Sequence, residues 1–446
     1  MKRRFTIPTW IPTLAFAAAI YLAVRYATQT ETITRYWYQV IQFAAITAIS
    51  ALGLNLIYGF NGQFSLGHVG FYAIGAYGSA LITKDFGRNP WSGDRVGALS
   101  WIIAAQLGIL LVLAAFRYLR IGRLRQRVRS TLASSLQPHE CNVICLLLTL
   151  AITALILAAG YYATIGLHWV AYRLNTALYA ALPQKLGVAV NFAVAILSGG
   201  TMAALVSYLV GLPLLRLGSD YFGIATLGFA IMMYTALQNS DLVIETMKGA
   251  RGMVGIPPYT TWTWAFGALV VCAIIMRNLI RSSQGRAIIS VREDEIAARA
   301  MGINVAQQKA MAFSFGGFFA GIAGALFAHL YGFLHPSSFN MIKGFDPLII
   351  IVFGGLGSMT GTIVASIGFA LLIEGLRVIL PQGFEDWRFV IYPILLLLVM
   401  LLRQEGLLGT REWGWLRAPL PPDRDIPVPP RALAAQRAGG NNSEEA

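Results

Sequence analysis

Polar side chains that could bind a small ligand gather in one short, otherwise apolar stretch of this 446-residue chain. The stretch is GLNLIYGFNGQFSLGHVGFYAIGAY, residues 53–77, and its polar positions include Asn61, Gln63, Ser65 and His68. Amide, hydroxyl and neutral imidazole groups donate and accept hydrogen bonds without carrying a fixed charge. Because glycines flank these side chains, the pattern indicates either close helix packing or a backbone that bends toward a ligand.

Ionisable residues inside apolar runs form a second set of candidates. Asp346 and Glu374 fall in a late apolar segment, and His68 and His329 lie in or beside other apolar runs. An ionised group in hydrocarbon is costly, so each of these is a candidate functional residue. For the two histidines a neutral hydrogen bond to a neighbouring helix is the favoured interpretation. For Glu374, packing against an arginine and a functional role both stay open.

Motifs for bond-making chemistry are missing from the sequence. It contains neither a G-x-x-x-x-G-K-[ST] phosphate loop nor an H-E-x-x-H zinc motif. Cys141 and Cys145 lie one helical turn apart near His139, but a metal site needs more ligands than these, and we interpret the cysteines as small packing residues. The sequence therefore predicts a protein that is not an enzyme and binds neither a metal nor a cofactor.

The elements that position these residues follow from the composition. The chain is 57% hydrophobic and 12% charged, with a mean hydropathy of +0.63, far too apolar for an ordinary soluble domain. About eleven apolar runs reach the roughly 20 residues that a helix needs to cross a bilayer. We therefore predict an all-α polytopic membrane protein with about 10–11 transmembrane helices. The runs are centred near Ala17, Ala48, Ala73, Leu110, Ala151, Ala203, Gly228, Val271, Ile322, Ile367 and Leu396.

The formal charge of +14 reflects topology rather than nucleic-acid binding, because the basic residues sit at the ends of apolar runs. The arginines between Arg117 and Arg129 predict a cytoplasmic loop, and Lys2 to Arg4 predict a cytoplasmic N-terminus. We divide the chain into residues 1–35 with a first span, a transmembrane domain over residues 36–416, and a proline-rich tail over residues 417–446 that we expect to be disordered.

One apolar segment is too long for a single span. Phe345 to Leu380 would extend about 54 Å as a helix, more than a bilayer thickness. GGLGSMTG, from Gly354 to Gly361, interrupts it. Non-helical backbone at membrane depth is tolerated where protein covers it or where it lines a cavity. We therefore predict a broken or re-entrant element near residues 345–380.

A charged stretch between two apolar runs predicts a short cytoplasmic helix at about residues 290–304. Ser290 and Glu293 match a capping box, while Gly302 supplies a stop and Asn304 a new start. Its small apolar face pairs Ile296 with Ala300, and Ala297 with Met301. Such a helix is either simply solvated or a docking site for a soluble partner.

Several long motifs, in this order, resemble the LivM-type permeases. They are the stretch at residues 53–77, LPLLRLGSDYFGIATLGFA, GRAIISVREDEIAARAMGIN, AGIAGALFAHLYGFLHPSSF, FGGLGSMTGTIVASIGFALLIE and RQEGLLG. The resemblance covers about Tyr38 to Lys84 and Leu186 to Gly409. LivM-type permeases are one of two permease subunits in the ATP-binding-cassette importers for branched-chain amino acids, in the bacterial inner membrane.

The resemblance implies partners: a LivH-type permease, two cytoplasmic ATP-binding subunits and an extracytoplasmic substrate-binding protein. ATP would then be bound by the partner subunits and not by this chain. Glu295, Ala297, Ala298 and Gly302 resemble the motif through which such permeases dock into an ATPase. The flanking charges and small residues fit such a contact.

Under this interpretation Asn61, Gln63, Ser65 and His68 form a flexible polar hinge beside the translocation path. Asp220 and Thr226, with Gln63 and Ser65, are the polar candidates for binding an amino acid. In the mechanism that we expect, ATP binding closes the ATPase pair, the docking helix is pulled, and the membrane helices rock to alternate access.

Two departures from the family pattern leave alternatives open. A loop reads MKGARGMVGIPP, in which Lys248 and Arg251 could attract a carboxylate, contact the binding protein or simply keep the loop soluble. Residues 88–185 match the family motifs poorly. Importers of urea, short amides or another small metabolite share these motifs, and a self-sufficient secondary carrier is the rival from a different class.

Overall fold

The computed structural model describes residues 10–30, 34–86, 96–119, 138–181, 183–215, 217, 219–379, 394, 397, 398, 401, 406–409 and 412. The predicted arginine loop, the C-terminal tail and the run centred on Leu396 lie largely outside these residues. The elements are α1 (Trp10–Gln29), α2 (Arg35–Leu54), the π-helix η1 (Asn55–Phe60), α3 (His68–Phe86), α4 (Val96–Leu119), α6 (Pro138–Ala181), α7 (Gln184–Leu214), α8 (Ser219–Gln238), η2 (Ser240–Leu242), η3 (Glu245–Met247), η4 (Gly249–Arg251), β1 (Met253–Val254), α9 (Trp262–Arg281), α10 (Ser283–Glu293), α11 (Glu295–Ala300), α12 (Val305–Tyr331), β2 (Phe333–Leu334), η5 (Pro336–Phe339), α13 (Met341–Gly354) and α14 (Met359–Ile379).

The prediction of an all-α polytopic membrane protein is confirmed. Within the described part of the chain, seven helical segments are long and apolar enough to cross a membrane. Three other predicted runs, centred near Ala17, Ala73 and Leu110, coincide with α1, α3 and α4. The segments are Arg35–Phe60, Leu155–Asn175, Leu186–Leu214, Tyr221–Gln238, Trp262–Arg281, Val305–Tyr331 and Met359–Val378.

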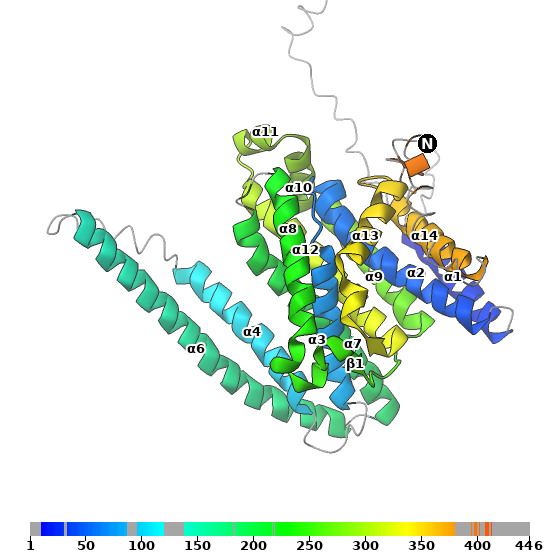
Figure 1. Ribbon diagram of the computed structural model, residues 1–446, viewed down its shortest axis with the longest axis horizontal. Coiled ribbons are helices and arrows are strands. Elements are labelled where there is room, and N and C mark those ends of the chain that lie inside the picture. The colour runs from blue at the N-terminus through cyan, green and yellow to red at the C-terminus, as the bar shows by residue number, and fades with distance from the viewer. Residues whose placement is uncertain are drawn as a thin grey trace, which may run out of the picture.

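Helix α12 occupies the centre of the bundle, where α2, α3 and α7 pack against it (Figure 1). Small residues allow this close approach: a Cβ added at Gly75 on α3 would lie 2.2 Å from the carbonyl oxygen of Gly321 on α12. Backbones that meet through glycine gain van der Waals contact, which is the main attraction between helices in lipid. The apolar run at Ile322 is therefore the core helix rather than a peripheral span.

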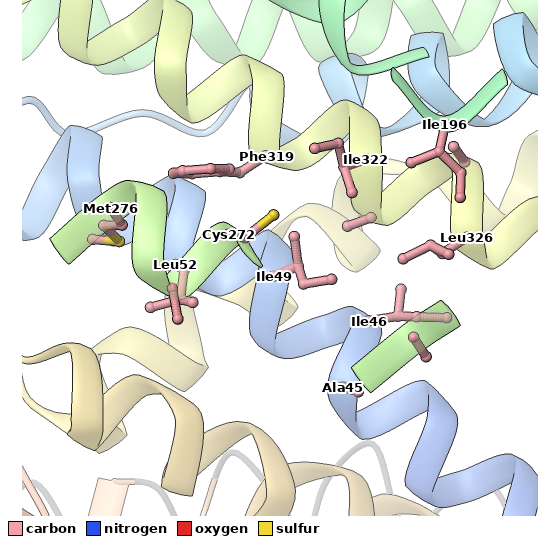
Figure 2. Close-up of a cluster of buried hydrophobic side chains, with 14 of the residues drawn as sticks. Ala45, Ile46, Ile49, Leu52, Ile196, Cys272, Met276, Phe319, Ile322 and Leu326 are labelled. Carbon is pink, nitrogen blue, oxygen red and sulfur yellow. The ribbon is translucent and has the colours of Figure 1, made fainter. Parts of the chain in front are cut away.

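A large apolar cluster joins α2 to α9 and α12 (Figure 2). Figure 2 shows Ile49 and Leu52 of α2 near Cys272 of α9 and near Phe319 and Ile322 of α12. Ile49, Leu52 and Phe319 are fully buried. Contacts of this kind fix α2 against α12, and they therefore fix the polar stretch that follows α2.

Helices α4 and α6 pack on each other and extend away from the bundle as a separate arm (Figure 1). Large side chains on α6, including Tyr161, Tyr162 and Trp169, are exposed. The arm is tied to α7 through Gln106, whose amide Nε2 donates to the carbonyl oxygen of Ser198 at 2.9 Å. Exposed apolar and aromatic side chains on helices of this length suit a lipid environment.

The predicted interruption near residues 345–380 is confirmed. Helix α13 ends at Gly354 and α14 begins at Met359, and a Cβ added at Gly354 would lie 2.4 Å from the carbonyl oxygen of Gly361. Ile351 of α13 and Ala365 of α14 belong to one buried cluster. These contacts make α13 and α14 an antiparallel hairpin, so the chain turns back instead of continuing as one long helix.

The predicted cytoplasmic helix is divided into two, and the predicted capping box is wrong. Ser290 and Glu293 lie in the last turns of α10, where the Ser290 hydroxyl donates to the carbonyl oxygen of Ala287 at 2.9 Å. The N-cap of α10 is instead Ser282, and that of α11 is Asp294. Both caps accept from backbone N–H groups two or three residues ahead, which satisfies donors that a helix start leaves free.

Candidate coupling and translocation site

The polar stretch begins with a change of helix type. Helix α2 continues without a break into the π-helix η1, so the reversal of the chain begins at Asn61. Gly62 has a φ of +75°, a conformation that favours glycine. The amide N–H of Gln63 donates to the carbonyl oxygen of Ile57 at 3.0 Å, which closes the reversal. π-Helical turns occur frequently at functional sites.

Buried polar atoms without partners are concentrated in this reversal. Asn61, Gln63 and Ser65 are 2%, 7% and 1% exposed. Both amide atoms of Asn61, Oε1 of Gln63 and Oγ of Ser65 have no hydrogen-bond partner in the described structure. A buried unsatisfied polar group costs about 1–3 kcal/mol. Because other packings of the reversal could satisfy these atoms, residues 61–65 are suited to a change of conformation.

The two histidines bond to neighbouring elements, in agreement with the favoured interpretation. His68 Nε2 lies 2.8 Å from the carbonyl oxygen of Ser50 on α2. His329 Nδ1 lies 2.7 Å from the carbonyl oxygen of Ala325, and its Nε2 lies 2.6 Å from the Thr83 hydroxyl on α3. A carbonyl can only accept, so the ring nitrogen facing it carries the proton in each case.

Thr226 joins the polar reversal to α8. Its hydroxyl oxygen accepts from the amide N–H of Leu66 at 3.1 Å and donates to the carbonyl oxygen of Gly223 at 2.9 Å. Thr226 is fully buried, so its hydroxyl fastens the loop to α8. Asp220 lies in the first turn of α8, and its side chain is outside the described residues.

The docking motif predicted from the sequence is split between an outward and an inward face. Ile296 and Met301 are 80% and 83% exposed, and Ala297 and Gly302 are exposed beside them. Ala298 differs from the prediction because it is 4% exposed and packs inward with Val291 and Val305. It therefore anchors α11, while its neighbours form the outward surface.

Charged contacts fix the orientation of α11. Glu295 forms ion pairs with Lys309 of α12 and, at 3.3 Å, with Arg299. Gly302 ends the segment with a φ of +81°, which confirms the predicted stop. The side chain of Asn304 then caps α12 by accepting from the amide N–H of Gln307 at 3.1 Å, as the sequence predicted.

Arg292 connects this segment to the polar reversal, and sequence reasoning did not assign it a role. Its guanidinium donates to the carbonyl oxygen of Gly59 at 2.5 Å. A Cβ added at Gly62 would lie 3.2 Å from Arg292 Cγ, and one added at Gly357 would lie 2.9 Å from its NH1. One side chain from α10 therefore touches both the reversal after α2 and the turn between α13 and α14.

From inside the bundle, Asn55 of the π-helix η1 connects the segment that leads into the reversal to the turn between α13 and α14. Its amide Nδ2 donates to the carbonyl oxygen of Ser358 at 2.9 Å and to the Thr362 hydroxyl at 2.8 Å. Its Oδ1 accepts from the amide N–H of Gly357 at 3.0 Å. A signal was present in the sequence, because Asn55 is an amide in the apolar run that leads into a glycine-rich loop.

A cavity of about 220 Å³ lies between the reversal and the docking segment. Asn61 and Gln63 line one wall, and Arg292 and Glu295 line another. The structure thus brings together the predicted hinge and the predicted docking motif, which are separated by more than two hundred residues in the sequence. Among the described residues, no group of three or more His, Cys, Asp or Glu side chains could hold a metal ion.

Comparison with known protein families finds one family whose model matches most of this chain. Residues 36–165 and 144–400 match the model of a family described as branched-chain amino acid transport system / permease component. The first of these ranges extends into the segment 88–185, which the sequence motifs did not include.

Individual relatives show the same similarity. The chain is 30% identical over 301 residues to the high-affinity branched-chain amino acid transport system permease protein LivM of Escherichia coli (strain K12), covering 58% of this chain and 68% of that protein. It is 27% identical over 179 residues to the permease protein LivH of Salmonella typhimurium, covering 40% of this chain and 55% of that protein. No solved structure matches the chain.

Proposed function

Because this chain belongs to the family of permease components of branched-chain amino acid transport systems, we propose that it imports a branched-chain amino acid with energy supplied by separate ATPase subunits. It is a multi-pass inner-membrane protein. Since its sequence contains no phosphate-binding loop, ATP is bound by partners, and this chain supplies the path and the docking surface.

One observation carries this proposal: an exposed apolar docking surface follows Arg292 in the chain, and Arg292 bonds to Gly59 just ahead of the hinge. We define the docking surface as Ile296, Ala297, Met301 and Gly302. Its two large side chains are at least 80% exposed at the end of the bundle opposite β1 (Figure 1). An apolar patch between charged groups suits a protein interface, where apolar contact gives affinity and charges set orientation.

The mechanism follows from the contacts of Arg292. When the partner ATPases close, they pull α11, and Asp294 and Arg292 transmit the displacement to α10 and to the carbonyl of Gly59. The reversal after α2 and the turn at Gly357 then move together, because Asn55 joins them. Movement of α2 against α13 and α14 changes which end of the bundle is open, which is alternating access.

The partners are part of the proposal. Relatives include both LivM and LivH permeases, which supports a second permease of the LivH type beside this chain. An extracytoplasmic binding protein would meet the loop η2–η4, where Leu242 and Val243 are 84% and 86% exposed and Lys248 and Arg251 are exposed. That loop lies at the end of the bundle away from α11.

The test is leucine uptake into vesicles that contain this chain with its partner permease, two ATPases and the binding protein. We expect ATP-dependent uptake of labelled leucine that excess isoleucine displaces and that glutamate and urea do not. Uptake without ATP would identify a secondary carrier. An assembled, ATP-hydrolysing complex that moves urea or another small metabolite instead of leucine would refute the proposed cargo.

A pair of variants tests the docking surface in the same vesicles. Ile296→Asp places a charge in the proposed interface and should abolish both copurification of the ATPases and uptake, while the chain still inserts in the membrane. Val243→Asp makes the same change at an equally exposed position on the opposite loop and should leave ATPase binding intact. Equal ATPase binding by both variants would contradict the assignment of α11.

A further inference from the structure

A second cavity, not used by the coupling mechanism, lies between α2, α3, α12, α13 and α14. Its volume is about 330 Å³, at the lower end of the roughly 300–1,000 Å³ that is usual for small-molecule sites. Phe333 of β2 and Ser338 of η5 are among the residues that line it, and β1 and β2 lie at the end of the bundle opposite α11 (Figure 1). Part of the cavity wall therefore belongs to the end of the bundle at which a binding protein would deliver cargo.

Two residues that line this cavity form an ion pair with each other. Lys343 Nζ lies 3.4 Å from Asp346 Oδ2, and the two side chains are 40% and 15% exposed. Glu374 also lines the cavity, but its carboxylate accepts from the Tyr36 hydroxyl at 2.7 Å and lies 3.6 Å from Arg377. Lys343 and Asp346 thus neutralise each other inside the cavity, whereas the charge of Glu374 is balanced from outside it.

The remaining wall is largely apolar. Phe43 of α2, Phe327 of α12 and Ile350 of α13 contribute to it. An aliphatic side chain of a ligand would be buried against these groups, and burial of its CH₂ groups favours binding. A charged ligand side chain would lose its hydration there without a partner, which is strongly unfavourable.

We propose that this cavity binds the translocated amino acid, with Asp346 accepting the α-ammonium group, Lys343 donating to the α-carboxylate, and the apolar wall holding the side chain. A zwitterion can break the Lys343–Asp346 ion pair and still give each of these two side chains a partner of opposite charge. A simple cation would leave Lys343 without its partner, and a simple anion would leave Asp346, only 15% exposed, without its partner, which is the costlier loss. The inference rests on the proposed function and adds to it the residues that select an apolar, zwitterionic cargo.

The position of the cavity connects it to the hinge. Ser50 of α2 lines the cavity, and the carbonyl of the same residue accepts from His68 at the start of α3. If the reversal at Asn61 to Gly67 moves, the hydrogen bond between His68 and Ser50 therefore transmits the movement to the cavity wall. Ile350 and Pro347 line the opposite wall from α13, whose far end meets Asn55 and the Gly357 turn.

The first test uses charge-neutral variants of nearly unchanged shape in the full transport complex. Asp346→Asn and Lys343→Met each remove one charge of the pair and should lower the rate of leucine uptake about tenfold or more, as loss of a charge-assisted hydrogen bond predicts. ATP hydrolysis by the assembled complex should remain. Glu374→Gln is the control: it removes a carboxylate from the same cavity, but Tyr36 and Arg377 already pair with that carboxylate. Leucine uptake by this variant should therefore fall by less than about threefold.

The outcomes of this test distinguish an error in the assignment of the cavity from an error in the proposed import function. If the wild-type complex imports leucine and both charge-neutral variants import it equally well, the assignment of the cavity is overturned and the importer stands. If the wild-type complex hydrolyses ATP but imports no branched-chain amino acid, the proposed function itself is overturned.

A second measurement leaves the ion pair intact, in case its variants fail to assemble. Thr47 lines the cavity, and a Thr47→Cys variant without the native cysteines provides a single thiol there. We expect saturating leucine to slow alkylation of this thiol at least about twofold, because bound ligand blocks the cavity, whereas saturating glutamate should not. An alkylation rate that leucine does not change would overturn the proposal.

Discussion

At the residue scale, Arg292 and Asn55 are the side chains that join distant parts of the chain. Arg292 reaches from α10 to Gly59 and the Gly357 turn, and Asn55 bonds to the same turn from inside the bundle. A charge-assisted hydrogen bond to a carbonyl contributes roughly 1.5–3 kcal/mol, more than a neutral one. The coupling pathway therefore depends on few contacts.

Replacing Arg292 by Met should uncouple transport from ATP hydrolysis. The variant keeps the apolar stem but loses the bond to the Gly59 carbonyl, so we expect leucine uptake per ATP hydrolysed to fall about tenfold or more. Arg286→Met is the matched control, because Arg286 lies on the same helix and bonds only locally, to the Arg281 carbonyl at 3.2 Å. Equal coupling ratios in the two variants would show that Arg292 does not transmit the motion.

At the element scale, contacts between small residues decide how closely the helices approach one another. Helix α3 can lie against α12 only because Gly75 meets Gly321, and α13 can turn back on α14 only because Gly354 meets Gly361. Shape rather than hydropathy brings these helices together, since lipid is as apolar as their side chains.

Gly75→Ala should therefore destabilise the bundle. The added methyl would overlap the Gly321 carbonyl, and overpacking of this kind costs about 1–3 kcal/mol. Gly267→Ala on α9 is the control, because a Cβ there meets no atom within 4 Å. In detergent, thermal unfolding followed by tryptophan fluorescence should show a lower midpoint for Gly75→Ala and an unchanged or higher one for Gly267→Ala. Equal midpoints for both variants would contradict the close packing of α3 on α12.

At the scale of the whole molecule, α11 with the docking surface lies at the opposite end of the bundle from β1 and β2, and Phe333 of β2 lines the cavity of Lys343 and Asp346 (Figure 1). Helix α9, with 20 residues, connects the loop η2–η4 to α10 and spans about the thickness of the hydrocarbon core. This separation is what an importer requires, because cargo arrives on one side of the membrane and energy is supplied on the other.

This arrangement predicts which side of the membrane each end occupies. In a background without native cysteines, Met301→Cys should react with an impermeant maleimide only in inside-out vesicles, and Val243→Cys only from the outside of intact cells with a permeable outer membrane. Both positions are more than 80% exposed in this chain, so in cells that lack the ATPases and the binding protein access does not limit either reaction. Labelling of both from the same side would contradict the topology.

The sequence by itself determined the class of this protein and most of its elements. Hydropathy locates the membrane helices because crossing lipid requires about 20 apolar residues, a local property of the chain. Glycine placement predicted the break at residues 354–361 and the end of the docking segment at Gly302, since both depend on local backbone geometry. The motif pattern likewise predicted the family, which the family comparison confirmed.

Only the tertiary structure decided which residues meet. The hinge at Asn61 to Gly67, the docking segment and the turn at Gly357 are far apart in sequence, and long-range packing against α12 brings them together. That packing turned Ala298, a residue of the predicted docking motif, inward, and it gave Arg292, to which the sequence assigned no role, a connecting one. Likewise, Asp346 could be recognised as half of an ion pair in a cavity only once α2, α12, α13 and α14 had closed around it, because burial and charge pairing are properties of the assembled bundle.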